Sequence, residues 1–355
     1  MTTTLLATLN FSLSGGRGYY PSPSVNGIMC IPLGNTLHQT LSYNLVPENV
    51  DSNRGDSALW EHEPASLPIA IPKQPVSGYA NLYTWPSRMI YLESETSGNV
   101  VFMRFVAGHG FDVTSNIIDP MQPYKTDKEK GRLPVQFRED RGTWRDFDSL
   151  IPDSSELAPL TIQNALRLAG KNLRFMPGSV LVLGLRYTPP NANVDFWRME
   201  RFVLPEVLAT NRFSREDVRQ FLDVAEETQK TLWQACSDYA RGIISHGDRD
   251  PDKKDISKAV KQMTASSLYW SMIESRFHET LSSYTLEADP DDIRCQWLKS
   301  VLDALCEAWE QHAASVATND AWTLRSLMKS EGLIRKKMKE LKDEIQKYEP
   351  REVGA

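Results

Sequence analysis

Proline divides this chain of 355 residues into two parts of different character. Beyond Pro205 only Pro251, Pro290 and Pro350 occur, whereas proline and glycine recur throughout the earlier part. Because proline lacks a backbone N–H and clashes with the preceding helical turn, long helices are expected only in the second part. At roughly 100–200 residues per domain, the length suggests two domains. We therefore expect one domain over residues 1–205 and another over residues 206–355.

The second part holds four long segments with apolar residues at helical spacing. In the last of them Ile334, Met338, Leu341 and Ile345 recur at intervals of three and four, as in a helix packed along its length. Short polar connections make neighbouring helices antiparallel, so this domain is predicted to be a four-helix bundle. The expected helices span about residues 214–244, 256–284, 291–314 and 320–348.

The sequence of the first part predicts short strands, short helices and long loops. Residues 36–46 carry leucines four apart, which indicates a helix, and residues 157–173 are a second helix candidate. Ser179–Tyr187 has the strongest strand pattern. Further short strands are expected at residues 82–83, 89–92 and 100–103. The chain is therefore predicted to be an α+β protein, an irregular mixed α/β domain followed by the bundle.

The composition is that of a globular protein, with 41% hydrophobic and 24% charged residues and a formal net charge of -6. This charge argues against a surface coated with cations, although it leaves local patches open. No run of about 18 apolar residues is present that could span a membrane, and no signal peptide pattern begins the chain. The four cysteines form no Cys-x-x-Cys pair, as expected of free thiols in a reducing compartment. We expect a cytoplasmic protein with no membrane partner.

One pair of side chains could begin a metal site. Glu274 and His278 lie four residues apart, on one face of a predicted helix. Metal sites in bundles take ligands from several helices, and no second Glu-x-x-His or His-x-x-x-His pair completes this one. A surface ion pair or a core histidine is the simpler interpretation. The sequence therefore predicts no metal, no cofactor and no enzyme.

Basic residues gather in two stretches of this acidic chain. Residues 125–145 hold seven basic and four acidic residues, interleaved with aromatic side chains, and residues 320–347 hold eight basic and five acidic ones. A solvated helix face accounts for the second stretch. Two basic stretches also fit a surface that meets phosphate in two places.

A glycine-rich segment, Ser14-Gly15-Gly16-Arg17-Gly18, lies near the N-terminus. Backbone without side chains can approach a polyanion closely. The segment is neither a P-loop, since no Gly-Lys-Ser/Thr follows, nor a dinucleotide-binding Gly-x-Gly-x-x-Gly fingerprint. On spacing alone, an ordinary loop remains the simplest interpretation.

Several blocks of sequence occur here in an order that is characteristic of one protein family. The blocks are Ser14–Tyr19, Gly34–Leu41, Asn44–Val46, Leu82–Arg88, Asp119–Met121, Trp144-Arg145, Gly184–Tyr187, Asn191–Val194 and Trp270–His278. Together they resemble the CasA family, the large subunit of the type I-E CRISPR surveillance complex Cascade. The resemblance covers nearly the whole chain. Members of that family usually carry a further N-terminal region, whereas here Met1 lies almost on the glycine-rich segment.

The resemblance implies a protein that reads DNA and catalyses nothing. In the family a glycine loop presents backbone to the minor groove of the protospacer-adjacent motif, and here that role falls to Ser14, Gly15, Gly16 and Arg17. The minor groove is narrow and its code degenerate, which suits a loop without large side chains.

Two further contacts are implied by the same resemblance. A family lysine supports the motif from a second loop, and Lys130 is its best counterpart, with Lys125 and Lys128 as alternatives. A family glutamine wedge inserts beneath the motif and starts strand separation. Asn191 aligns with that wedge and Asn193 lies next to it, so a shorter amide stands where glutamine is common.

The resemblance also assigns a role to the bundle, which in the family packs on the small subunits along the displaced DNA strand. The basic face implied for that strand comprises Arg335, Lys336, Lys339 and Lys342.

The resulting hypothesis is a large subunit that recognises the motif in double-stranded DNA, opens the duplex and supports the R-loop. Its implied partners are the backbone and small Cascade subunits with their CRISPR RNA, the target DNA and a helicase-nuclease effector. The alternative is a purely structural scaffold subunit, with the motif read elsewhere in the complex.

Overall fold

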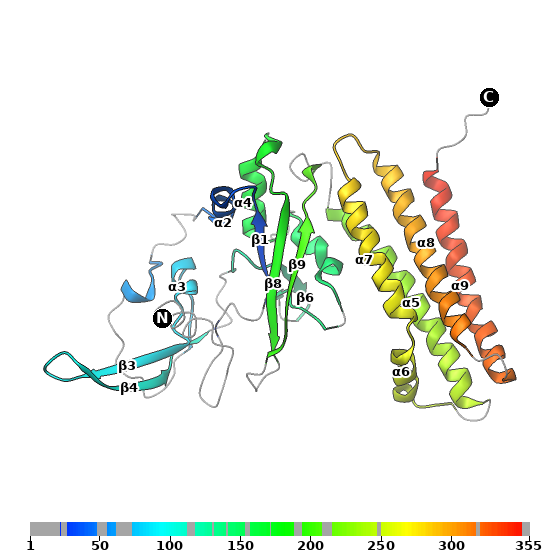
Figure 1. The fold of residues 1–355 in the computed structure, drawn as a ribbon, viewed down its shortest axis with the longest axis horizontal. Coiled ribbons are helices and arrows are strands. Elements are labelled where there is room, and N and C mark those ends of the chain that lie inside the picture. Colours follow the sequence, from blue (N-terminus) through cyan, green and yellow to red (C-terminus); the bar gives the residue numbers. More distant parts are fainter. Residues whose placement is uncertain are drawn as a thin grey trace. The chain divides into compact units, whose positions relative to one another are not determined.

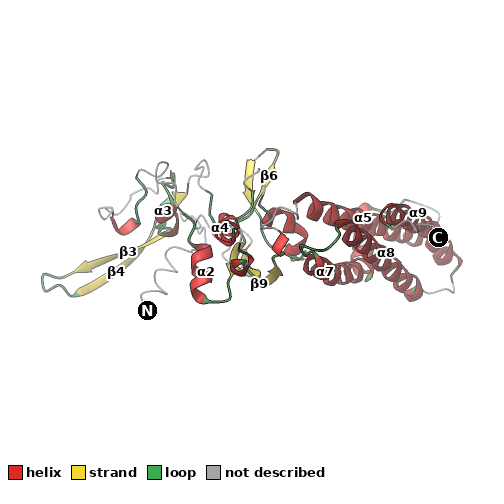
Figure 2. Cartoon of the chain, turned by 90° about the horizontal axis from the view of Figure 1, so that it is seen from above, coloured by secondary structure: helices red, strands yellow, loops and turns green. Residues whose placement is uncertain are grey.

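The computed structural model describes most of the chain, and the statements below concern the residues that it describes. These are residues 22, 27–47, 55–61, 73–111, 118–129, 131–139, 141–152, 157–170, 172–187, 194–207, 215–246, 250–316 and 320–349. The chain divides into two compact units, Met1–Phe202 and Val203–Ala355, each described by itself (Figure 1). Strands and short helices make up the first unit and long helices the second, so the predicted α+β class is confirmed (Figure 2).

A three-stranded sheet organises the first unit. Its order is β1 (Met29–Leu33), β8 (Ser179–Tyr187) and β9 (Val194–Val203). β1 runs antiparallel to β8, with Cys30 opposite Val182. These two side chains are fully buried, and the Thr161 hydroxyl of α4 (Leu160–Ala169) donates a hydrogen bond to the Cys30 carbonyl over 3.0 Å. The strand predicted at residues 179–187 is confirmed, and the helix candidate at residues 157–173 forms over a shorter span.

Short elements complete the first unit. Two of them confirm the strands predicted at residues 89–92 and 100–103, because β3 (Arg88–Ser94) and β4 (Val100–Ala107) pair antiparallel. The others are α2 (Leu37–Asn44), η2 (Leu59–Glu61), β2 (Lys73–Gln74), α3 (Tyr79–Tyr83), β5 (Gly110–Phe111), β6 (Tyr124–Asp127), β7 (Gly131–Pro134), η3 (Thr143–Leu150) and η4 (Leu173–Phe175).

The helix predicted at residues 36–46 forms as α2, but for a reason other than its leucines. Thr36 and Gln39 form a capping box in which each side chain accepts a hydrogen bond from the backbone N–H of the other. Leu37 and Leu45 are 75% and 73% exposed, so the leucine stripe packs on no core of the described residues. The buried residue is Tyr43, whose hydroxyl donates to the Phe175 carbonyl over 2.6 Å.

The strand predicted at residues 82–83 is wrong, because these residues belong to the helix α3. The Asp56 carboxylate accepts hydrogen bonds from the Ala80 and Asn81 backbone N–H groups over 2.8 and 3.0 Å. It thus satisfies two donors that the first turn of a helix leaves unpaired. Leu82 then packs into a small core with Trp85. A cap that comes from 24 residues away overrides the local strand preference.

The described residues of the second unit form four long helices and one short one. They are α5 (Arg215–Ser245), α6 (Lys253–Gln262), α7 (Ala265–Ser283), α8 (Pro290–Ser315) and α9 (Ala321–Tyr348). Polar side chains tie them together: the Trp297 indole N–H donates to the Phe221 carbonyl, and the Tyr269 hydroxyl to the Ala225 carbonyl, each over 2.9 Å. None of the described helices is long and apolar enough to cross a membrane.

The single helix predicted at residues 256–284 is wrong in one respect, because α6 and α7 are separate helices. Met263 has extended backbone angles (φ −79°, ψ 141°), and α7 begins afterwards, with Thr264 as its N-cap residue. The turn lets Val260 of α6 and Ala265 of α7 both be buried. No proline or glycine marks the break, which explains why helical periodicity alone missed it.

His312 of α8 is a buried titratable group inside the second unit. It is 4% exposed and its ring packs edge-on against Tyr239 of α5, with centroids 5.1 Å apart. Among the described residues, its Nε2 atom has no hydrogen-bond partner. Burial lowers the pKa of His312, because the charged imidazolium would lose its hydration there.

We expect His312 to make folding sensitive to mild acid. Below the ordinary histidine pKa of about 6.5, the unfolded chain binds a proton at this histidine that the folded chain does not readily bind. The free energy of unfolding therefore decreases as the pH is lowered. The thermal unfolding midpoint, followed by helix circular dichroism at pH 7.5 and 5.5, should drop less in His312→Phe than in the wild type. The exposed His38, changed to Gln, is the control and should leave the drop unchanged. An equal drop in all three proteins would contradict this account.

Candidate nucleic-acid interface

The hairpin β6–β7 presents basic side chains at a tight turn. Lys125 and Lys128 are exposed. The Asp127 carboxylate accepts a hydrogen bond from the Glu129 N–H over 2.9 Å. Gly131 closes the turn with φ +74°, a backbone conformation that other residues rarely adopt. The hairpin therefore holds Lys128 at the tip of a short arm and Lys125 on its first strand.

The base of this hairpin is fixed by a buried cluster of hydroxyl and carboxylate groups. The Tyr83 hydroxyl donates to Asp119 Oδ1 over 2.9 Å, and the Met121 N–H donates to the same oxygen. The Asp119 N–H donates to the Tyr124 hydroxyl over 2.9 Å. Burial, together with the nearby Asp119 carboxylate, raises the pKa of Tyr83. Both tyrosines therefore stay neutral and act as hydrogen-bonding groups.

The segment that carries this hairpin is joined to the strand that follows the glycine-rich region. Strand β1 pairs with β8 along one edge. On its other side, the Ile28 N–H donates to the Val135 carbonyl over 2.9 Å and the Cys30 N–H to the Met121 carbonyl over 2.8 Å. Backbone hydrogen bonds thus connect residues 28–33 with both β8 and the two ends of the β6–β7 segment.

Near its C-terminal end, strand β8 contacts the residues that follow β7. The Phe137 ring is 1% exposed and lies against Gly184, where a Cβ atom would come within 3.1 Å of the ring. The Arg186 guanidinium donates from Nη1 to the Phe137 carbonyl over 3.2 Å. A side chain at position 184 would therefore require the Phe137 ring to shift slightly, so glycine gives the closest packing here.

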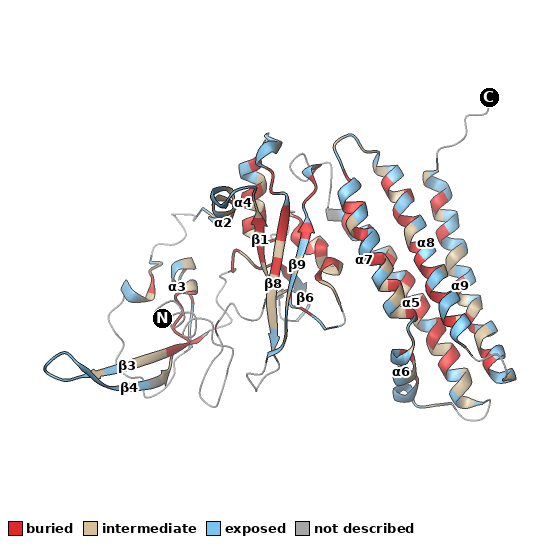
Figure 3. Ribbon diagram, in the orientation of Figure 1, coloured by how far each residue is buried: buried red, intermediate tan, exposed pale blue. Residues whose placement is uncertain are grey.

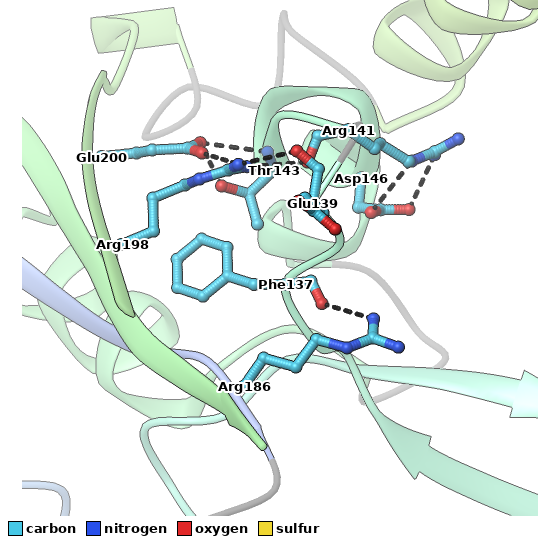
Figure 4. A network of polar contacts seen from close by, with 8 residues as sticks. All are labelled: Phe137, Glu139, Arg141, Thr143, Asp146, Arg186, Arg198 and Glu200. Atoms are coloured by element: carbon cyan, nitrogen blue, oxygen red, sulfur yellow. Dashed lines mark hydrogen bonds and ion pairs between the residues drawn. The ribbon is translucent and has the colours of Figure 1, made fainter. Parts of the chain in front are cut away.

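Arg198 of strand β9 binds the loop that follows β7, at residues 139–141 (Figure 4). The Arg198 guanidinium donates to the Arg141 carbonyl over 2.9 Å and to the Glu139 carbonyl over 3.1 Å. Its Cζ atom also lies 5.6 Å from the centre of the Phe137 ring, a cation–π distance. Arg198 thus holds the loop after β7 by polar and aromatic contacts together.

The neighbouring Glu200 completes the network. One of its carboxylate oxygens accepts hydrogen bonds from the Thr143 N–H, over 3.0 Å, and from the Thr143 hydroxyl. The other oxygen lies 3.4 Å from Arg198 Nη1. Because the arginine and the glutamate alternate along β9, both point to the same side of the strand and meet the same loop (Figure 4).

The residues predicted to contact DNA directly fall mostly outside the described residues. This applies to Ser14, Gly15, Gly16 and Arg17, to Lys130, and to Asn191 and Asn193. The structure does describe the elements that flank them. Hydrogen bonds join four of these elements in the first unit. They are β1, the segment that carries the β6–β7 hairpin, and the strands β8 and β9 on either side of residues 188–193.

The basic face predicted on the last helix lies on α9 of the second unit. Arg335, Lys336, Lys339 and Lys342 are all exposed. Arg335 forms an ion pair with Glu331 over 3.0 Å. For the three lysines, the described part of the chain provides no ion pair. Their charges therefore remain available to a polyanion in solution.

The remaining sequence-level candidates are also placed. Glu274 and His278 lie on α7, and no third ligand joins them: the described residues contain no group of three metal-binding side chains. Cys30, Cys236 and Cys295 are buried free thiols, and burial raises the pKa of Cys236 to about 12. Protonated, buried thiols of this kind act as small apolar side chains.

Sequence reasoning missed Arg186, Arg198 and Glu200. A signal was present in β9, where Phe196, Arg198, Glu200 and Phe202 alternate with Trp197, Met199 and Arg201. Two oppositely charged side chains on the aromatic side of a strand indicate a polar network against an aromatic core. Their partners at residues 137–143 lie too far away in sequence to be identified without the structure.

Comparison with known proteins assigns the chain to a class. Residues 1–308 match the family model for CRISPR-associated protein Cse1. The CRISPR-associated protein CasA/Cse1 of Thermus thermophilus is 27% identical over 333 residues, which are 91% of this chain and 64% of the relative. The chain is thus a CRISPR-associated protein that spans less than two thirds of the length of that relative.

Solved structures agree with this match. A crystal structure of Thermus thermophilus CasA superposes with a TM-score of 0.73 at 26% identity, over 91% of this chain and 66% of the other. Cse1 of Thermobifida fusca has the same fold, with a TM-score of 0.64 at 19% identity, over 94% of this chain and 66% of the other. The chain belongs to the Cse1 family, whose members are also called CasA.

We expect Arg198 to stabilise the first unit measurably. Replacing it by Met keeps the aliphatic stem but leaves the Glu139 and Arg141 carbonyls without their charged donor. Hydrogen bonds to a charged group contribute about 1.5–3 kcal/mol, and the free energy of unfolding in urea should fall by that amount. Arg174→Met is the matched control, because Arg174 is exposed, and it should change stability by about 0.5 kcal/mol or less. Equal losses in the two variants would contradict the role of Arg198.

Proposed function

We propose that this chain is the large subunit of a CRISPR RNA-guided Cascade complex and recognises the protospacer-adjacent motif in double-stranded DNA. It acts by binding, with no catalytic step of its own. Recognition starts duplex opening, supports R-loop formation and leads to recruitment of a helicase-nuclease. Its partners are the backbone and small subunits with their CRISPR RNA, and the target DNA.

One observation carries this proposal beyond family membership. The elements that flank all three predicted DNA-contacting segments are joined by hydrogen bonds around β1, β8 and the loop after β7. The glycine-rich segment precedes this junction, the lysine hairpin is built on it, and residues 188–193 connect its two strands. A motif reader and a wedge that share one rigid base would keep a fixed separation on the DNA.

A fixed separation matters because of the order of events in RNA-guided recognition. Binding of the motif must be followed by local melting immediately next to it, where the seed heteroduplex forms. Inserting a side chain between base pairs costs a few kcal/mol of stacking energy. A wedge that is already positioned by motif contacts meets that cost with binding energy gained at the motif.

The exposed lysines of α9 support a second DNA contact in the same proposal. Single-stranded nucleic acid binds along grooves and faces of positive charge, and each phosphate contact releases counterions. Lys336, Lys339 and Lys342 recur at intervals of three along α9, so they form a row of charge that is inclined to the helix axis and could contact the displaced strand.

The motif-reading role is tested by substituting the glycine loop. Gly15→Val with Gly16→Val adds Cβ branches that the minor groove, about 6 Å wide, does not accommodate next to backbone. In the assembled complex, binding to motif-bearing duplex should weaken by about 1–3 kcal/mol, the scale of one lost base-pair contact. Binding to a target already opened as a bubble should be nearly unchanged.

Asn191→Ala serves as the companion variant in that assay. It should slow opening of the duplex, followed by fluorescence of a base analogue next to the motif, and should leave the bubble target unaffected. Equal losses on duplex and bubble for the glycine variant would contradict motif reading, and complete R-loop formation by Asn191→Ala would remove the wedge role. A complex that assembles yet binds DNA independently of both segments would favour the scaffold alternative.

The displaced-strand role of α9 predicts a specific salt dependence. Changing Lys336, Lys339 and Lys342 together to Gln should reduce the slope of log affinity against log salt by up to about 2, at about 0.7 per phosphate contact. The matched control changes the exposed Lys253, Lys254 and Lys258 of α6 to Gln. The reduction should appear with full duplex targets and vanish when the strand to be displaced is omitted. The same slope in both variants would contradict the assignment.

A further inference from the structure

The end of β8 that leads to residues 188–193 carries an exposed arginine. The strand is buried at Ser179 and becomes exposed at Arg186 (Figure 3). The Arg186 guanidinium donates from Nη1 to the Phe137 carbonyl over 3.2 Å. Arg138 follows Phe137 in the chain and is also exposed. The hydrogen bond thus links Arg186 to the residue that precedes Arg138, and we call Arg138 and Arg186 the arginine pair.

The charges of the arginine pair differ from those of two other arginines in the same network. Arg141 forms an ion pair with Asp146 over 2.9 Å, and Arg198 forms one with Glu200 over 3.4 Å (Figure 4). Among the described residues, no carboxylate forms an ion pair with either member of the arginine pair, and this includes the adjacent Glu139. Because arginine remains protonated in proteins, the pair presents two positive charges that no ion pair neutralises.

The fold holds the Arg186 side chain in place before any ligand binds. Its guanidinium is fixed to the Phe137 carbonyl, and the Phe137 ring in turn packs against Gly184 of the same strand. A side chain that is ordered beforehand loses less conformational entropy on binding. A guanidinium has five N–H donors in one plane, and in the described part of the chain a single one of them is used. The donors that remain suit the bidentate geometry of a phosphate.

The neighbours of the arginine pair identify the class of ligand. Arg138 belongs to the segment that carries the lysine hairpin, where Lys125 and Lys128 are exposed. Several cations on one segment attract a polyanion, and a single bound anion would need fewer. Arg186 lies just before residues 188–193, which we propose to start strand separation. The backbone phosphates of duplex DNA are therefore the complementary ligand.

We propose that the arginine pair binds adjacent backbone phosphates of the target DNA, next to the motif and where strand separation starts. The inference rests on the proposed function, because it requires that target DNA bind at this junction. Phosphate contacts position a protein on the duplex and read no base. Arg186 therefore has two tasks: Nη1 holds the loop after β7, and its other donors hold the DNA backbone in register with residues 188–193.

The salt dependence of DNA binding by the assembled complex tests this proposal. Arg138→Gln and Arg186→Gln should each reduce the slope of log affinity against log salt by about 0.9, the value for one phosphate contact on B-DNA. Between about 50 and 200 mM salt, the wild-type affinity should therefore fall about threefold further than that of either variant. The motif preference should stay unchanged, since the lost contact reads no base.

Arg174→Gln is the matched control, because Arg174 is an exposed arginine of the same unit, and it should keep the wild-type slope. Arg138→Gln protects the test against a loss of structure in Arg186→Gln, since in the described residues the Arg138 side chain forms no hydrogen bond. Wild-type slopes in both variants of the arginine pair would overturn the proposal. Loss of guide RNA or of a subunit from the variant complexes would also overturn it, because the arginines would then bind those partners.

Neutral backbone linkages locate the contact on the DNA. Duplexes that carry one methylphosphonate each, at successive positions around the motif, are bound by the wild-type and Arg186→Gln complexes. The wild type should lose affinity about tenfold at a linkage beside the motif, the scale of a hydrogen bond to a charged group. Arg186→Gln should show no further loss at that linkage and the same losses as the wild type at all others.

The outcomes separate this inference from the proposed function. A complex that selects a motif, but in which the Arg186→Gln and methylphosphonate losses add at every linkage, would refute the phosphate contact alone. A complex in which the two losses coincide at one linkage, but which shows no motif preference, would support the contact and refute only motif reading.

Discussion

Strand β1 is the element on which the arrangement of the first unit depends, because both of its edges are used. One edge pairs with β8, and the other donates backbone hydrogen bonds to residues 121 and 135, on either side of the lysine hairpin. Moving any of these segments relative to the others leaves buried backbone groups unpaired, which is costly. The described elements that come before or after the segments proposed to contact DNA are therefore held on one base, although they lie far apart in sequence.

Strand β9 shows how alternation separates two kinds of side chain along one element. On one side Arg198 and Glu200 hold the loop at residues 139–143. On the other side Trp197 and Met199 remain exposed. Charge is separated in the same manner on α9, where Ile334 and Leu341 are buried and the lysines are exposed. The net charge of -6 is thus compatible with the proposed DNA binding, because the proposed contacts involve only local groups of basic residues.

The sequence was sufficient where a pattern is local and periodic. The strand at residues 179–187 and the long helices α5, α8 and α9 follow from their own residues. The predictions were wrong where a distant residue caps a helix, and where a helix ends without a proline or glycine to mark the break. Asp56 caps α3 from 24 residues away, and Met263 breaks a helix without glycine or proline. Arg198 and Glu200 find their partners almost sixty residues earlier in the chain, so the polar network could not be foreseen.

The central claim is that motif reading by this chain depends on the glycine-rich segment that precedes β1 in the sequence. A library of duplexes randomised next to the target, bound by the assembled complex and sequenced, measures this most directly. The account predicts that the wild-type complex selects a short motif, and that the complex with both Gly15→Val and Gly16→Val loses the selection while still binding pre-opened targets. An unchanged motif preference in the variant complex would contradict the account.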